Sequence, residues 1–73
     1  MLIKYINVGR SVGILIKRKR ISQSELAESL GMTRQRVSMI LSQRTVQSRV
    51  LDKLCDYFQM SASELVEIGQ DYE

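Results

Sequence analysis

Two arginines and a glutamine open a short predicted helix at a place where acidic residues are the usual choice. Arg34, Gln35 and Arg36 directly follow Thr33, and residues 34–41 contain no Asp or Glu. Free N–H groups give the first turn of a helix a positive partial charge, so cations there are unfavourable for the chain alone. Arginine can form two hydrogen bonds with O6 and N7 of guanine, and glutamine can do so with N6 and N7 of adenine. These residues therefore indicate a surface that binds the edges of DNA bases.

The other predicted DNA contacts surround this helix. Met39 can contact a thymine methyl group, and Ser38 is the next residue of the outward face that can reach a base. Arg36 can reach either a base or a phosphate. Gln23 begins the preceding helix, where its side chain and the free N–H groups of the helix can bind a phosphate. The remaining predicted phosphate contacts are polar or basic residues near helix ends: Arg18, Ser22, Thr33, Ser42, Gln43, Arg44, Thr45 and Arg49.

The stretch that holds these residues reads as one amphipathic helix that is stopped and restarted. Ser22 and Glu25 form an S-x-x-E capping box, which predicts a helix start. Gly31 suits the left-handed conformation that ends this helix, and Thr33 is a suitable cap for the next one. Two short helices joined by a glycine-containing turn are the helix-turn-helix signature. Such a turn lets the N-terminal half of the second helix enter a major groove while the first helix crosses the DNA backbone.

Three further helices are predicted around this motif, so the chain is expected to form an all-α fold of five helices. The first starts at Asn7, a suitable N-cap, and ends in the basic run at residues 17–20. The fourth covers about residues 48–58, and a second capping box starts the fifth at Ser61. Residues 2–6 fit either a short N-terminal strand or the frayed start of the first helix.

The apolar residues at helical spacing are enough for one core, so a single domain is expected over residues 1–73. The helix-turn-helix occupies about residues 22–41, and its recognition helix about residues 34–41. Met32, in the turn, is expected to pack into the core. The predicted core residues of the helices are Val8, Val12, Leu15, Ile16, Leu26, Ala27, Leu30, Val37, Ile40, Leu41, Val50, Leu51, Leu54, Cys55, Phe58, Leu65, Val66 and Ile68.

The net charge of +3 conceals two oppositely charged parts. Residues 1–50 hold ten Lys and Arg against two Glu, whereas residues 51–73 hold one Lys against six Asp and Glu. The first part therefore suits a polyanion such as DNA, and the second does not.

The composition excludes most other chemistry. The chain has no His and one cysteine, so an internal disulfide, a His-containing zinc site and a Cys-His or Ser-His catalytic pair are all excluded. Cys55 lies in an apolar helical pattern and is expected to pack in the core of a cytoplasmic protein, where thiols stay reduced. No apolar run approaches the roughly 20 residues that span a membrane. We therefore expect no enzymatic activity, no cofactor or metal, and no membrane association.

The segment ISQSELAESLGMTRQRVSMI, residues 21–40, resembles the helix-turn-helix of the phage repressor and Cro superfamily, also called the XRE type. The shared features are the S-Q at the first helix start, the E-L-A, the L-G turn and the threonine cap. FQMSASEL, residues 58–65, is similar to the short turn into a capped fifth helix in that family. The resemblance covers about residues 8–68 and implies a lambda-repressor-like fold of five helices. It also implies that the third helix reads duplex DNA, commonly as a dimer on a palindromic operator, and that Gln23 anchors a phosphate and supports the first recognition residue. The residues whose counterparts contact bases are Arg34, Gln35 and Met39.

The chain departs from the family pattern at several places. Relatives often pair an Arg of the first helix with a Glu at the end of the third, and Ile16 and Leu41 stand at those positions here. This is a coherent change, because packed hydrocarbon can replace a buried ion pair. Arg20 stands where relatives often have Gly, and Ser42-Gln43 stand where they often have Asn-Gly.

Two classes of function remain open. The first is a Cro-like or controller-type transcription regulator that binds its operator as a homodimer. In a chain of 73 residues no separate effector domain is expected, and therefore no small-molecule effector. The second is an antitoxin-like or other protein-interaction module, whose acidic C-terminal part binds a protein partner. The regulator fits better, because a purely protein-binding domain has no need of Arg34, Gln35 and Arg36 together.

A dimer would need an apolar surface of its own. The predicted dimer residues are the C-terminal set Leu65, Ile68 and Tyr72. The alternative is an N-terminal strand that contains Leu2, Ile3, Tyr5 and Ile6. Either set can instead complete the core of the monomer.

Overall fold

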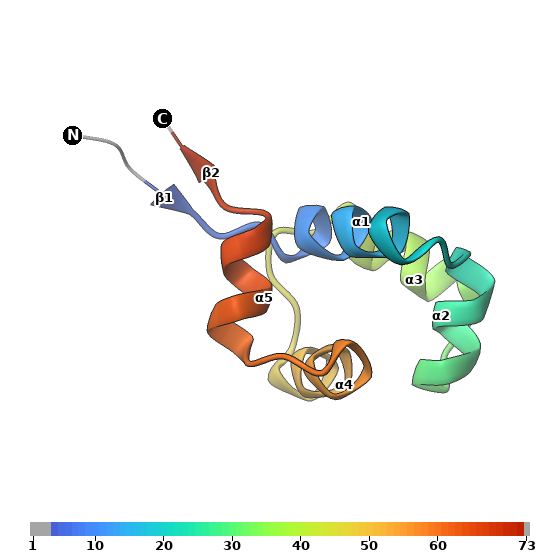
Figure 1. Cartoon of the computed structure of the whole chain (residues 1–73). Helices are drawn as coiled ribbons and strands as arrows, with labels where there is room; N and C mark the ends of the chain where they lie inside the picture. The colour runs from blue at the N-terminus through green and yellow to red at the C-terminus, as the bar shows by residue number, and fades with distance from the viewer. Residues whose placement is uncertain (1–3, 73) are drawn as a thin grey trace.

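The computed structural model describes residues 4–72, which form five helices and one short two-stranded ribbon (Figure 1). The helices are α1 (Val8–Lys19), α2 (Gln23–Leu30), α3 (Arg34–Leu41), α4 (Ser48–Phe58) and α5 (Ala62–Ile68), and the strands are β1 (Lys4–Tyr5) and β2 (Asp71–Tyr72). α1 packs against α3 and α5, α2 packs against α3 and α4, and α4 also packs against α5. The predicted all-α fold of five helices is confirmed.

The ribbon joins the two ends of the chain. β1 and β2 pair antiparallel, with Lys4 opposite Tyr72. The ribbon projects from the helices beside the start of α1 and the end of α5 (Figure 1). The strand alternative for the N-terminal segment is thus confirmed at residues 4–5, whereas Leu2 and Ile3 lie outside the described residues.

The break between α2 and α3 is built as the sequence predicts. At the start of α2, the Glu25 N–H donates to Ser22 Oγ at 3.0 Å and the Ser22 N–H donates to Glu25 Oε1 at 3.2 Å. Gly31 ends α2 in the left-handed region with a φ of 69°. Thr33 Oγ1 accepts a hydrogen bond from the Arg36 N–H at 3.1 Å. These bonds satisfy backbone groups that a helix break exposes, and α2 and α3 leave the turn in different directions (Figure 1).

The core lies between the helices and contains a single aromatic side chain among its buried residues, Phe58. Val37 is fully buried and anchors α3, while Met32 packs partly buried against the core from the turn, as predicted. Five predicted core residues stay partly exposed at its edge: Leu41, Leu51, Cys55, Val66 and Ile68. The others are all buried: Val8, Val12, Leu15, Ile16, Leu26, Ala27, Leu30, Val37, Ile40, Val50, Leu54, Phe58 and Leu65.

The start of α1 holds the segment that follows α3. The Val8 N–H donates to the Arg44 carbonyl at 2.8 Å, and the Gly9 N–H donates to the Gln43 carbonyl at 2.9 Å. These are N–H groups of the first turn, which have no partner within their own helix. A Cβ on Gly9 would lie 2.5 Å from the carbonyl oxygens of Gln43 and Leu41. Two backbone hydrogen bonds and a close approach of backbones therefore hold the segment after α3 against the start of α1.

The capping box at the start of α5 makes the stability of the chain depend on pH. Glu64 Oε1 accepts a hydrogen bond from the Ser61 N–H at 3.1 Å, and the Glu64 N–H donates to Ser61 Oγ at 3.2 Å. These bonds with the backbone and side chain of Ser61 lower the pKa of Glu64 below its ordinary value of 4.5. A lowered pKa means that the ionised group stabilises the fold above the unfolded pKa, and that this contribution is lost as pH falls through the folded pKa.

We expect Glu64→Gln to lower the melting temperature at neutral pH, with a difference from the native chain that disappears in acid below the ordinary carboxyl pKa of 4.5. Thermal unfolding followed by circular dichroism at a series of pH values measures this difference. The matched control is Glu67→Gln, at an exposed glutamate in the last turn of the same helix, which lies outside the capping box and should not lower the melting temperature at neutral pH. A difference for Glu64→Gln that stays constant from neutral pH into acid would contradict the prediction.

Candidate nucleic-acid interface

The outward face of α3 is exposed along its whole length. Val37 and Ile40 turn inward and are 0% and 4% exposed. Met39 is 55% exposed, so its apolar side chain is available to a partner. The exposed residues of this face are those that the sequence predicts: Arg34, Gln35, Arg36, Ser38, Met39 and Ser42.

The structure divides these residues between two sides of α3. On one side a hollow, which we call the α2 hollow, is lined by Gln23, Arg34, Gln35 and Ser38. Gln23 is the first residue of α2, and Arg34 and Gln35 are the first two of α3. The helix-turn-helix thus brings the start of α2 beside the leading end of α3.

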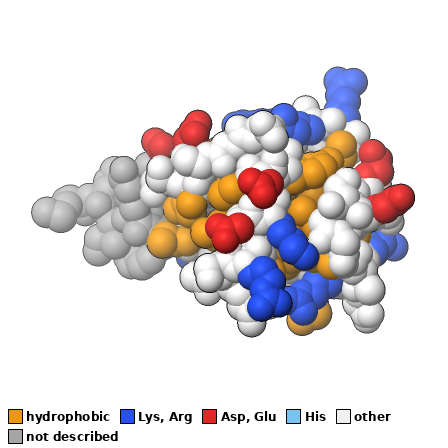
Figure 2. All heavy atoms as spheres, turned by 90° about the horizontal axis from the view of Figure 1, so that it is seen from below, with side chains coloured by type: hydrophobic (Ala, Val, Ile, Leu, Met, Phe, Trp, Pro, Cys, Tyr) orange, Lys and Arg blue, Asp and Glu red, His pale blue; other side chains and the backbone are white. Residues whose placement is uncertain are grey.

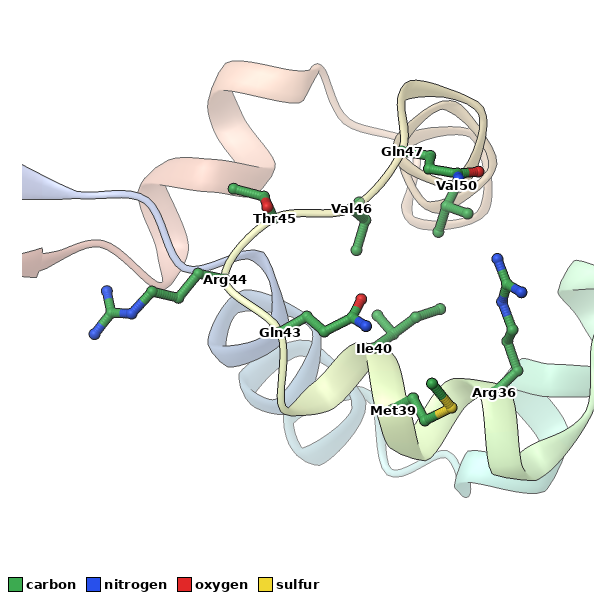
Figure 3. Close-up of a pocket in the computed structure, with 9 residues that line it drawn as sticks. All are labelled: Arg36, Met39, Ile40, Gln43, Arg44, Thr45, Val46, Gln47 and Val50. Atoms are coloured by element: carbon green, nitrogen blue, oxygen red, sulfur yellow. The ribbon is translucent and has the colours of Figure 1, made fainter.

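On the other side of α3 lies a groove toward α4, which we call the α4 groove (Figure 3). Its apolar lining comes from Met39, Ile40, Val46 and Val50, and its other lining residues are polar or basic. In Figure 3 the Arg36 side chain points toward α4, whereas the Arg44 side chain points away from the groove. The Arg36 side chain therefore lies on a different side of α3 from those of Arg34 and Gln35. The lining residues are Arg36, Met39, Ile40, Gln43, Arg44, Thr45, Val46, Gln47 and Val50.

Three cations gather beside the start of α4. Arg36, Arg49 and Lys53, which we call the α4 basic cluster, line one hollow together with Met32 and Gln47. Gln47 is the N-cap of α4 but makes no side-chain hydrogen bond to the helix, so its side chain does not cap the first N–H groups of α4. Figure 2 shows one group of basic side chains along the lower edge of one face of the molecule and others along its upper edge, with acidic side chains between them.

Lys53 belongs to this cluster although the charge pattern of the sequence places it in the acidic part of the chain. Its Nζ donates to the Leu30 carbonyl at 3.3 Å, which ties α4 to the C-terminal end of α2. The spacing of four residues between Arg49 and Lys53 puts both on one face of a helix. That spacing is the signal in the sequence that could have identified Lys53.

The other predicted phosphate contacts differ in what their polar groups already do. Ser22 and Thr33 are exposed, and their hydroxyl oxygens accept the capping bonds of α2 and α3. The Ser42 hydroxyl donates to the Met39 carbonyl at 2.8 Å, so its hydrogen is used within the chain. Arg18 is exposed in the last turn of α1.

The prediction of Leu65 as a dimer residue is wrong. Its side chain is 0% exposed in the monomer, because α5 packs against both α1 and α4. Ile68 is half-buried and packs against the same core, and the side chain of Tyr72 lies outside what the structure describes. In the N-terminal alternative, Ile6 is 51% exposed.

The described residues offer no other obvious chemistry. Between residues 4 and 72, no three His, Cys, Asp or Glu side chains are placed to hold a metal ion. Burial, with smaller contributions from the carboxylates of Asp52 and Asp56, raises the pKa of the Cys55 thiol, so the thiol stays protonated and weakly nucleophilic at neutral pH. None of the helices in this part of the chain combines the length and the hydropathy needed to cross a membrane.

Two short helices, a left-handed glycine between them and an exposed basic leading end define a helix-turn-helix domain. Residues 13–71 match the family of Cro/C1-type helix-turn-helix DNA-binding domains, and the chain belongs to that family. It is thus a DNA-binding protein of transcription regulation, and the resemblance seen in residues 21–40 is confirmed. No curated protein and no solved structure matches the chain.

Proposed function

We propose that this chain is a sequence-specific regulator that binds a palindromic operator as a homodimer, with α3 of each copy in a major groove. The observation that supports this most directly is the outward face of α3, which is polar, basic and free of acids, and whose leading residues lie beside Gln23 in the α2 hollow. A major groove admits a helix of this kind.

The two sides of α3 have different roles in this proposal. Arg34 and Gln35 face the α2 hollow and read bases, with Ser38 beside them and Met39 against a thymine methyl group. Arg36 points toward α4 (Figure 3) and binds a phosphate instead of a base. A helix in the major groove has one DNA strand on each side, so the α2 hollow and the α4 basic cluster would each face one phosphate backbone.

The phosphate contacts then follow from position. Gln23 and Ser22 bind phosphates of the DNA strand beside α2, and Arg18 and Thr33 are assigned to the same strand. Arg36, Arg49 and the first N–H groups of α4 bind phosphates of the other strand. Gln43 and Thr45 line the α4 groove next to that strand, and Arg44 contributes its backbone carbonyl to the start of α1.

Dimerisation places two recognition helices on two half-sites that are about one helical turn apart. With Leu65 in the core, the exposed Ile6 favours the N-terminal segment as the dimer surface. The whole chain would then act as one DNA-binding domain that pairs through its own end.

The experiment that tests the proposal is selection from a random pool of duplex DNA at about 0.15 M salt, where nonspecific phosphate attraction is already weakened. We expect a pseudo-palindrome with half-site centres about 10 base pairs apart. Recovery of no motif by the folded protein would overturn the proposal and favour a protein-interaction module that uses the acidic α4–α5 part.

A further inference from the structure

We propose that Arg20, in the link between α1 and α2, binds a DNA phosphate on the strand that faces the α2 hollow. This inference rests on the proposed function and adds a residue to the interface.

Two described residues other than glycine have a positive φ, Arg20 at 56° and Gln59 at 57°. Both are helix C-caps, Arg20 of α1 and Gln59 of α4. A side chain is unfavourable in this left-handed region, which glycine adopts without a Cβ clash. Each position therefore holds a residue that is less stable there than glycine would be, and each side chain needs an explanation.

The Gln59 side chain has a local explanation. Its Nε2 donates to the Asp56 carbonyl at 2.9 Å, so it satisfies one of the last carbonyls of α4. Arg20 has no counterpart to this bond. Its backbone N–H donates to the Lys17 carbonyl at 3.3 Å, but its exposed side chain has no hydrogen bond or ion pair among the residues that the structure describes.

The helix dipole does not explain Arg20 either. A cation is favourable near the C-terminal end of a helix, but the last turn of α1 already contains three: Lys17, Arg18 and Lys19. Non-glycine residues in sparsely populated backbone regions persist when another contact compensates for them, and such residues cluster at functional sites.

The position of Arg20 in the chain points to a DNA phosphate as the compensating contact. Arg20 is three residues before Gln23, so their Cα atoms are at most about 11 Å apart. Gln23 lines the α2 hollow with Arg34 and Gln35. The link itself is fixed, because the Ile21 N–H donates to the Ile16 carbonyl at 3.1 Å and Ile21 packs partly buried against the core. The fixed link thus keeps the exposed Arg20 close in the chain to the start of α2, where one phosphate backbone would run.

The test uses three variants of the full chain with two duplexes of equal length, the selected operator and a random sequence. Arg20→Gly should raise the melting temperature by a few degrees, because glycine adopts the left-handed backbone conformation without a Cβ clash. It should weaken binding to both duplexes about 5–10-fold at 0.1 M salt and reduce the slope of log K against log salt by about one. Arg20→Gln, which keeps a side chain in the left-handed region, should lose the same affinity without the gain in melting temperature.

Gln59→Gly is the matched control, since it changes the same backbone conformation at the end of α4 and should bind both duplexes as the native chain does. If Arg20→Gly and Arg20→Gln bind with native affinity and slope, the proposal is overturned, while operator selection by the native chain leaves the proposed function standing. If the native chain selects no operator, the proposed function fails, and the salt slope on the random duplex still decides the role of Arg20.

Discussion

Alanine in place of Gly9 is expected to lower the free energy of unfolding by about 3 kcal/mol or more. The added Cβ would lie 2.5 Å from the carbonyl oxygens of Gln43 and Leu41 and 2.6 Å from that of Ile40. These are backbone atoms at the end of α3, so relief of the contact requires that α1 and α3 move apart. For a chain of this size, whose total stability is about 4–11 kcal/mol, the melting temperature should fall by about 12–24 °C.

Gly13→Ala is the matched control for this prediction. Gly13 lies in the same helix, and its Cβ would meet only the Leu41 Cδ2 at 4.0 Å, an ordinary contact. Alanine is favoured over glycine inside a helix by about 0.5–1 kcal/mol, so Gly13→Ala should stabilise the chain. Thermal and urea unfolding of both variants measure the difference. Similar effects of the two substitutions would show that the close approach at Gly9 does not hold α1 against α3.

The local elements of the fold could be predicted because neighbouring residues determine them. Ser22 with Glu25 and Ser61 with Glu64 form capping boxes within one turn of chain, and both exist as predicted. Gly31 ends α2 for a reason that concerns only its own backbone. The candidate interface could be predicted for the same reason, since the exposed face of α3 follows from the buried positions of Val37 and Ile40.

Features that depend on distant segments could not be predicted in the same way. The sequence pattern around Leu65 is the same whether this residue lies in a dimer surface or in the core of the monomer. The packing of α5 against α1 and α4 buries it in the core. The sequence gives no sign that Gly69 approaches α1, yet a Cβ there would clash with the Ser11 N atom, so this glycine lets the end of α5 reach α1. That Arg36 shares a hollow with Arg49 and Lys53 likewise depends on where α4 lies.

The paired substitution Arg34→Ala and Gln35→Ala is expected to remove most of the preference of the chain for its operator. Both side chains are exposed in the α2 hollow, so the fold should keep its melting temperature. A well-formed pair of hydrogen bonds to one base discriminates by about 1–3 kcal/mol, so loss of two pairs should weaken operator binding about 30-fold or more. Binding to a random duplex should fall much less, because only one cation is removed.

Arg49→Ala separates base reading from phosphate binding in this experiment. It also removes one cation, from the α4 basic cluster on the other side of α3. Because a phosphate contact is the same in every sequence, this variant should weaken binding to the operator and to the random duplex by a similar factor. Fluorescence anisotropy with both duplexes at several salt concentrations gives the affinities and the salt slopes. If the paired variant instead lost affinity equally for both duplexes, as expected for Arg49→Ala, then Arg34 and Gln35 would contact phosphates and the specificity of the chain would have to come from Met39, Ser38 or the shape of the DNA.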